Sequence, residues 1–79
     1  MTKESIFNAV KEAIVEILPD IEVHEVQPEM SLKDIGANSV DRMDIIIRTM
    51  ELTDIKVPLV EFGKLSNIQG IIDLLDAKK

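Results

Sequence analysis

Aliphatic residues recur at spacings of three and four in three separate stretches of this chain, which is the period of an α-helix with one buried face. The first predicted helix covers about residues 5–18, with Thr2 capping its first turn and Pro19 ending it. Its buried face consists of Ile6, Val10, Ala13, Ile14 and Ile17. A chain dominated by this period is expected to be helical throughout.

The second predicted helix covers about residues 39–51, with Asn38 or Ser39 as its N-cap. At 100° per residue, an arc of roughly 120° gathers five of its apolar side chains. The members of this arc are Val40, Met43, Ile46, Ile47 and Met50. Ile45 lies away from the arc, so this helix is apolar on more than one side.

A third helix is predicted to begin at Ser66, because Ser66-Asn67-Ile68-Gln69 has the sequence of a capping box. The buried face of this helix consists of Ile68, Ile71, Ile72 and Leu75. Lys78 and Lys79 follow at its end, where positive charge suits the helix dipole.

Two connections separate these helices. Residues 19–38 form a long loop, and the apolar residues spread through it predict that it is pinned onto the core. These residues are Val23, Val26, Met30, Leu32 and Ile35. Within this loop, residues 31–34 are expected to make one capped turn. In the second connection, residues 60–62 are expected to make one helical turn that Gly63 ends.

Together these elements predict a single domain, residues 1–79, of the all-α class. The expected architecture is a small four-helix bundle with three substantial helices, one short helix between the second and the last, and a long first loop. A chain of this length supports a sufficient but thin core, which leaves little room for a large catalytic cleft.

Composition excludes several classes of function. Fifteen acidic against nine basic residues give a net charge of −6. This balance argues against nucleic-acid or anionic-lipid binding and suits partners with basic surfaces. Without cysteine there is no disulfide and no thiolate metal site, and no apolar run approaches the length of a membrane span, about 18 residues. We expect a monomeric cytoplasmic protein.

Ser39 stands between a polar turn and the second helix, so its hydroxyl is expected to be exposed. A catalytic serine needs a base, and His24, the only histidine, is expected to be solvated in the long loop. The pair Asp41 and Asp44 and the acids of 22–29 lack the spacing of a calcium loop, so no metal site is expected. We therefore expect no enzymatic activity. From the residues alone, Ser39 is either a group to be modified or only a helix cap.

The segment Gly36-Ala37-Asn38-Ser39-Val40 resembles acyl carrier proteins, in which a Gly-x-Asp-Ser-Leu/Ile/Val motif opens the second helix. The likeness covers essentially the whole chain, including the Val57-Pro58 connector. It implies that a phosphopantetheinyl transferase moves 4′-phosphopantetheine from coenzyme A onto Ser39, and that the thiol of this arm carries acyl groups as thioesters. Asn38 departs from the family's Asp, which removes a charge close to the serine that the transferase must reach.

The resemblance also implies that partner enzymes dock on the second helix. Its acids are expected to steer basic partners, and its apolar residues are expected to add contacts or to border a pocket for the acyl chain. The predicted docking residues are Val40, Asp41, Arg42, Met43, Asp44, Ile47 and Glu51. For Ile46 and Met50, plain core packing is the expectation.

The connector at residues 55–64 is mostly apolar with two lysines, whereas fatty-acid carriers usually have an acidic connector. Together with Ser39-Val40-Asp41-Arg42, this makes the chain similar to free-standing polyketide-pathway carriers, particularly the donors for β-branching. The implied partners are a ketosynthase/decarboxylase, an acyltransferase or an enzyme resembling HMG-CoA synthase. A fatty-acid or aminoacyl carrier stays open as an alternative, as does an unmodified helical docking module, which Asn38 favours.

Overall fold

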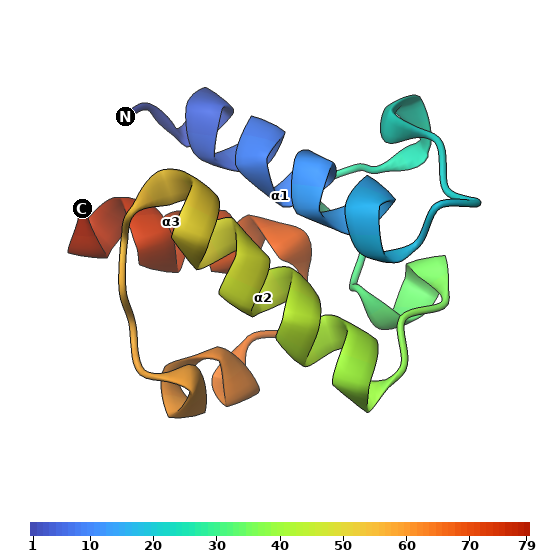
Figure 1. Ribbon diagram of the computed structural model, residues 1–79. Coiled ribbons are helices and arrows are strands. Elements are labelled where there is room, and N and C mark those ends of the chain that lie inside the picture. Colours follow the sequence, from blue (N-terminus) through green and yellow to red (C-terminus); the bar gives the residue numbers. More distant parts are fainter.

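The computed structural model describes residues 1–79 as three α-helices and three short 3-10 helices, without a strand (Figure 1). The α-helices are α1 (Lys3–Ile17), α2 (Ser39–Thr53) and α3 (Ile68–Lys78). The 3-10 helices are η1 (Val23–Glu25), η2 (Lys33–Ile35) and η3 (Leu59–Lys64). In Figure 1, α1 runs opposite to α2 and α3 and packs against both, and the two chain ends lie close together. The predicted all-α class, with three substantial helices and a shorter one before the last, is confirmed.

The N-cap and the buried face of α1 follow directly from its local sequence. Its N-cap is Thr2, whose hydroxyl oxygen accepts a hydrogen bond from the Ser5 amide at 3.1 Å. The predicted aliphatic face is buried: Ile6, Val10, Ala13 and Ile14 are each 0% exposed. Ala9 joins this face, and Ile17 is half-buried against the core at the end of the helix. Periodicity alone therefore describes how α1 packs.

The helix α2 packs differently from its predicted arc. Val40, Met43 and Ile47 are exposed, whereas Ile46 and Met50 are half-buried against the core, as expected for those two. The buried face instead consists of Ile45, Thr49 and Thr53. Thr49 lies about 180° from Val40 on the helical wheel, so the predicted arc straddles the boundary between core and solvent. The core packing expected for Ile46 and Met50 is therefore observed, whereas the threonine-lined core face of α2 was not predicted.

The long first loop is held against the core by its side chains and by its backbone. Three of its apolar side chains, Val26, Leu32 and Ile35, are buried. Its backbone also contacts α3, because the carbonyls of Pro28 and Met30 accept hydrogen bonds from the Gln69 and Ile68 amides at 2.7 and 2.8 Å. These amides belong to the first turn of α3, which has no intrahelical partner for them. Val23, which was expected to help pin the loop, is 47% exposed, and that part of the prediction is wrong.

The start of α3 also differs from its prediction. The helix begins at Ile68 and its N-cap is Asn67, whose side-chain oxygen accepts from the Gly70 amide at 2.9 Å. The predicted capping box at Ser66 needs a free Gln69 amide, but Pro28 already occupies that donor. A long-range contact thus displaces the local signal by one residue. The predicted buried face of Ile68, Ile71, Ile72 and Leu75 is confirmed.

The second connection is anchored by apolar residues on both sides of Pro58. Ile55 and Val57 precede it and are buried, and Phe62, inside η3, is 6% exposed. The short helix spans Leu59–Lys64 and so includes Gly63, which was expected to end it. Because the Leu65 amide donates to the Phe62 carbonyl, the turn continues past the glycine. These anchors hold η3 as the short helix between α2 and α3.

Candidate functional site

The turn before Ser39 is fixed by two buried residues and one glycine. Ile35 and Ala37 are buried on either side of Gly36, which has φ +90° and ends η2 in the left-handed region. Only glycine adopts this conformation without strain. The Ala37 amide then donates back to the Leu32 carbonyl at 3.1 Å, which closes the turn. The chain emerges from the core directly before Ser39.

The N-terminus of α2 is capped by Asn38, one of the two predicted alternatives. Its side-chain oxygen accepts from the Asp41 amide at 2.8 Å, and the Asp41 carboxylate accepts from the Asn38 amide at 3.3 Å. This reciprocal pair is a complete capping box. Ser39 is therefore the first helical residue, and its exposed hydroxyl takes no part in the cap. The interpretation of Ser39 as only a helix cap is wrong.

One side chain reaches the free hydroxyl. The Arg42 guanidinium, one turn further along α2, donates from Nη2 to the Ser39 Oγ at 3.3 Å. This contact follows from the i, i+3 spacing of the two residues on a helix. The sequence contained that spacing, but Arg42 was considered as a docking residue and as part of the likeness to donor carriers, and not as a partner of Ser39. An exposed oxygen with a cation beside it is suited to carry an anionic group.

A groove of about 380 Å³ opens beside Ser39. Met43 and Ile46 of α2 form one wall, and Phe62, Leu65 and Ile71 contribute the other. Met43 thus borders a pocket as predicted, whereas Val40 and Ile47 do not line this groove. Sequence reasoning missed the opposite wall, because its residues come from η3, the following turn and α3, and no local pattern joins them to Ser39.

The predicted docking residues divide into two groups. Val40, Met43, Asp44, Ile47 and Glu51 are exposed and fall within an arc of roughly 100° on α2, which we call the outward face. Asp41 and Arg42 are half-buried, and their side chains contact Asn38 and Ser39 respectively. The structure therefore places five of the seven residues on one accessible surface beside the groove.

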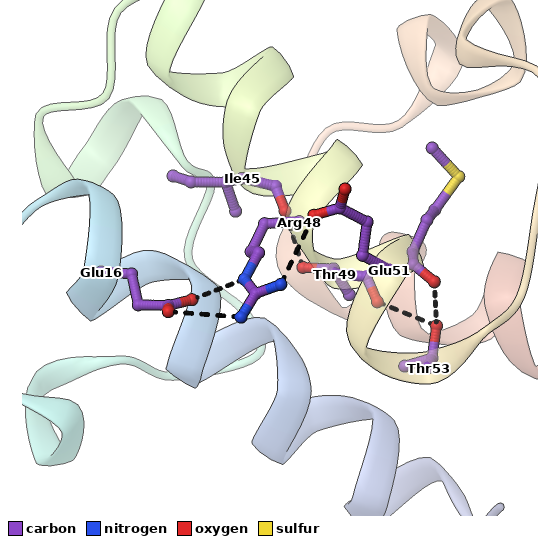
Figure 2. Close-up of polar contacts among 7 residues, drawn as sticks. Glu16, Ile45, Arg48, Thr49, Glu51 and Thr53 are labelled. Atoms are coloured by element: carbon purple, nitrogen blue, oxygen red, sulfur yellow. Dashed lines mark hydrogen bonds and ion pairs between the residues drawn. The ribbon is translucent and has the colours of Figure 1, made fainter.

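Arg48, the second arginine of α2, lies next to the outward face on the side that meets α1. Figure 2 shows the Arg48 guanidinium between Glu16 of α1 and Glu51, with Nε and Nη2 at 2.9 and 3.4 Å from the two Glu16 carboxylate oxygens. The Glu16 hydrogen bonds and charge raise the pKa of Arg48 above its usual value, with a smaller contribution from Glu51 at 3.5 Å. Arg48 is thereby held toward α1, and Asp44 forms no ion pair.

The structure also places the residues that were considered as catalytic or metal-binding candidates. His24 lies on η1, is exposed, and is absent from the groove beside Ser39. No group of three or more His, Asp or Glu side chains converges on one point. None of the helices is long and apolar enough to cross a membrane.

A small helical bundle that presents one free serine hydroxyl at a helix N-terminus has the features of a carrier domain. The chain matches the family described as "Phosphopantetheine attachment site" over residues 8–75. It is 36% identical over 75 residues to the polyketide biosynthesis acyl-carrier protein AcpK of Bacillus subtilis, covering 95% of this chain and 92% of that protein. The chain therefore belongs to the acyl carrier protein family, and the predicted carrier function and covalent 4′-phosphopantetheine are confirmed.

A solved structure gives a second relative. The chain superposes with a TM-score of 0.88 and 36% identity on one chain of "Crystal Structure of the Curacin Biosynthetic Pathway HMG Synthase in Complex with Acetyl Donor-ACP". The match covers 99% of this chain and 100% of that chain, so the matched chain is the small carrier protein of that complex and not the synthase. The predicted resemblance to polyketide-pathway carriers is confirmed by the first relative, and the resemblance to donor carriers by the second.

The residues around Ser39 fit the phosphopantetheine group. The free hydroxyl offers a point of attachment, and the α2 N-terminus and Arg42 supply positive charge for a phosphodiester. The groove, whose lining is half hydrophobic, begins at the same residue. When bound, the group supplies a terminal thiol, which this cysteine-free chain lacks.

Proposed function

We propose that this chain carries thioester-bound acyl groups on a phosphopantetheine arm attached to Ser39, and that it donates them to a polyketide-pathway enzyme resembling HMG-CoA synthase. It acts as a carrier and not as an enzyme. The observation that carries the proposal is the exposed Ser39 hydroxyl, which the Asn38 cap leaves free at the start of α2. Because the arm comes from coenzyme A, we assign this role to the cytoplasm.

The donor subtype rests on several independent features. One relative is a polyketide carrier protein, and the other is the acetyl donor carrier in a complex with an HMG synthase. The connector that contains η3 presents apolar side chains, with Leu59 39% and Val60 77% exposed, where fatty-acid carriers are expected to be acidic. A ketosynthase/decarboxylase or an acyltransferase that loads the arm would meet the same end of the molecule.

In this proposal each residue near the site has one task. The Ser39 oxygen forms the bond to the phosphorus of the arm, the pyrophosphate bond of coenzyme A breaks and adenosine 3′,5′-bisphosphate leaves, and the serine proton passes to the transferase. Asn38 and Asp41 hold the first turn of α2, so that the oxygen keeps its position. On the outward face, Val40, Met43 and Ile47 contact the partner, while Asp44 and Glu51 steer its approach. A partner that meets this face has the reactive end of the arm within its reach.

Intact mass spectrometry tests the attachment site. After incubation with coenzyme A, Mg²⁺ and a broad-specificity phosphopantetheinyl transferase, we expect the mass of one phosphopantetheine to be added. Ser39→Ala should abolish the gain, at a cost to stability of about 1 kcal/mol at most, because Asn38 provides the cap. Ser66→Ala is the matched control, since Ser66 is exposed and lines the same groove. A gain that persists in Ser39→Ala refutes the assignment, and no gain in the wild type favours an unmodified docking module.

A further inference from the structure

Arg42 is one of the basic residues of this acidic chain that pair with no carboxylate, and it is the one that contacts Ser39. The other arginine, Arg48, is held by Glu16 and Glu51, and three of the lysines also pair with carboxylates. Arg42 pairs with none of the fifteen acids. The one hydrogen bond that its side chain makes is the donation to the Ser39 Oγ at 3.3 Å. The positive charge of the Arg42 guanidinium is therefore unpaired, and its other N–H groups can still donate to an anion.

The neighbouring carboxylate does not compete for this arginine. Asp41 precedes Arg42 in the chain, but its carboxylate is the second half of the capping box and accepts from the Asn38 amide. Arg42 is half-buried, it lines the groove that begins at Ser39, and its hydrogen bond to Ser39 is exposed. Helical geometry keeps it there, because residues three apart share a face.

We propose that the Arg42 guanidinium binds the phosphodiester of the arm and thereby fixes the first segment of the arm over the groove. The inference rests on the proposed attachment at Ser39. The phosphorus is one bond away from the Oγ that Arg42 already contacts, and its free oxygens accept the remaining N–H donors. Arginine suits this task because its planar fork matches two oxygens of a phosphate at once. Arg42 is thus a positioning residue for the arm.

A diffuse electrostatic effect is the competing explanation. The α2 N-terminus attracts an anion by itself, and Lys33 brings a second cation to the same groove. A direct contact depends on the position and shape of the Arg42 side chain, whereas a diffuse field depends only on the number of nearby charges. Removing Lys33 removes the same charge from the groove without touching the hydrogen bond to Ser39. Lys33→Gln is therefore the matched control for Arg42→Gln.

The test compares apo and holo forms of the wild type, Arg42→Gln, Arg42→Lys and Lys33→Gln at low ionic strength. Intact mass first establishes that each holo protein carries one arm on Ser39, so failure of the proposed function is seen separately as a missing adduct. The ³¹P resonance of the phosphodiester and the side-chain ¹H–¹⁵N signals of Arg42 then report on the contact itself. Thermal unfolding of each pair gives the stabilisation that the arm provides.

For the wild type we expect the Arg42 side-chain signals to shift and sharpen on modification, and the holo form to melt about 1 to 4 °C above the apo form. Arg42→Gln should move the ³¹P resonance and abolish this difference in melting temperature. Arg42→Lys should retain part of it, and Lys33→Gln nearly all. Added salt should reduce the difference in the wild type. An unchanged ³¹P resonance and melting difference in Arg42→Gln, or an equal loss in Lys33→Gln, would overturn the proposal.

Discussion

The helices α1 and α2 are both fifteen residues long and pack against each other, yet they use their apolar residues in opposite ways. On α1 the aliphatic face is buried, with Ile6, Val10 and Ile14 each 0% exposed. On α2 one isoleucine, Ile45, is buried together with two threonines, while three large apolar side chains remain on the outward face.

The buried threonines make this arrangement possible without an unpaired polar group. The Thr49 hydroxyl donates to the Ile45 carbonyl at 2.7 Å, and the Thr53 hydroxyl donates to the Thr49 carbonyl at 2.9 Å, as Figure 2 shows. No buried side-chain oxygen or nitrogen lacks a partner. Because the core face of α2 is satisfied in this way, Val40, Met43 and Ile47 are not needed for packing. Their exposure leaves them available for the partner contacts proposed for the outward face.

The largest expected effect is the difference in stability cost between truncating a buried isoleucine of α1 and an exposed isoleucine of α2. Ile14→Ala on α1 should destabilise the fold by about 3 to 4 kcal/mol, because it leaves a cavity in a fully buried site. Ile47→Ala on α2 should cost about 1 kcal/mol or less, since that side chain is 38% exposed. Urea unfolding of both variants measures the difference. Equal losses would show that Ile47 is a core residue and would remove it from the outward face.

The outward face is tested next by its charges. Asp44→Lys with Glu51→Lys should slow association with an HMG-CoA-synthase-like partner by about tenfold at low salt, because steering charges act on the association rate. Asp44 should contribute more than Glu51, which Arg48 partly neutralises at 3.5 Å. Stopped-flow measurements of the loaded carrier at low and high salt give the rates.

The matched control for this reversal lies on α1. Glu4→Lys with Glu12→Lys changes the net charge by the same amount on exposed positions of the other helix. The control variant should associate at a rate closer to that of the wild type. If both variants slow equally, net charge alone governs the encounter. If neither slows, apolar contacts alone explain recognition by the partner.

Sequence reasoning succeeded where one helix face meets one core. The buried faces of α1 and α3 follow from aliphatic residues at helical spacing, and the loop turn at η2 follows from its local caps. There the Ser31 hydroxyl and the Asp34 carboxylate accept from each other's amides at 3.0 and 2.9 Å, as a capped turn requires. In each case the determining contacts lie within a few residues of one another.

Sequence reasoning failed where contacts between residues far apart in the chain determine the structure. On α2, threonine counts as polar in a periodicity argument, so Thr49 and Thr53 were not recognised as the core face. At α3, the Pro28 carbonyl occupies the Gln69 amide that a local capping box at Ser66 needs. The groove has the same origin, because its second wall comes from η3 and α3. The serine itself was predictable, since its exposure depends on the adjacent cap alone.

A smaller effect is expected from exchanging the two kinds of core residue. Thr49→Val should change stability by less than about 1 kcal/mol, because the hydroxyl is replaced by a methyl group and no partner is left unsatisfied. The opposite change on α1, Val10→Thr, should destabilise by about 1 kcal/mol, since it buries a hydroxyl among aliphatic side chains. Urea unfolding distinguishes the two. A large loss in Thr49→Val would mean that its hydrogen bond is essential to α2.

The smallest effect concerns pH and compares the ties that α1 makes to its two neighbours. Lys3 of α1 pairs with Asp73 of α3 at 3.1 Å, and the Gln69 amide donates to the same carboxylate oxygen at 2.9 Å. The Gln69 hydrogen bond and then Lys3 lower the pKa of Asp73 below its usual 3.8. Because the folded pKa is lowered, this contribution to stability is complete above pH 3.8 and is lost as pH falls through the lower folded value.

The opposite sign applies to the lysine. The Asp73 hydrogen bond and charge raise the pKa of Lys3 above 10.5, so its contribution is complete below that pH and is lost as pH rises through the higher folded value. The tie to α2 contains Arg48, which stays charged throughout. Carboxyl NMR titration should therefore place the Asp73 midpoint below 3.8, and Asp73→Asn should flatten the acid limb of the melting temperature. A midpoint at or above 3.8, with an unchanged acid limb in Asp73→Asn, would mean that α1 is held to α3 by its buried face alone.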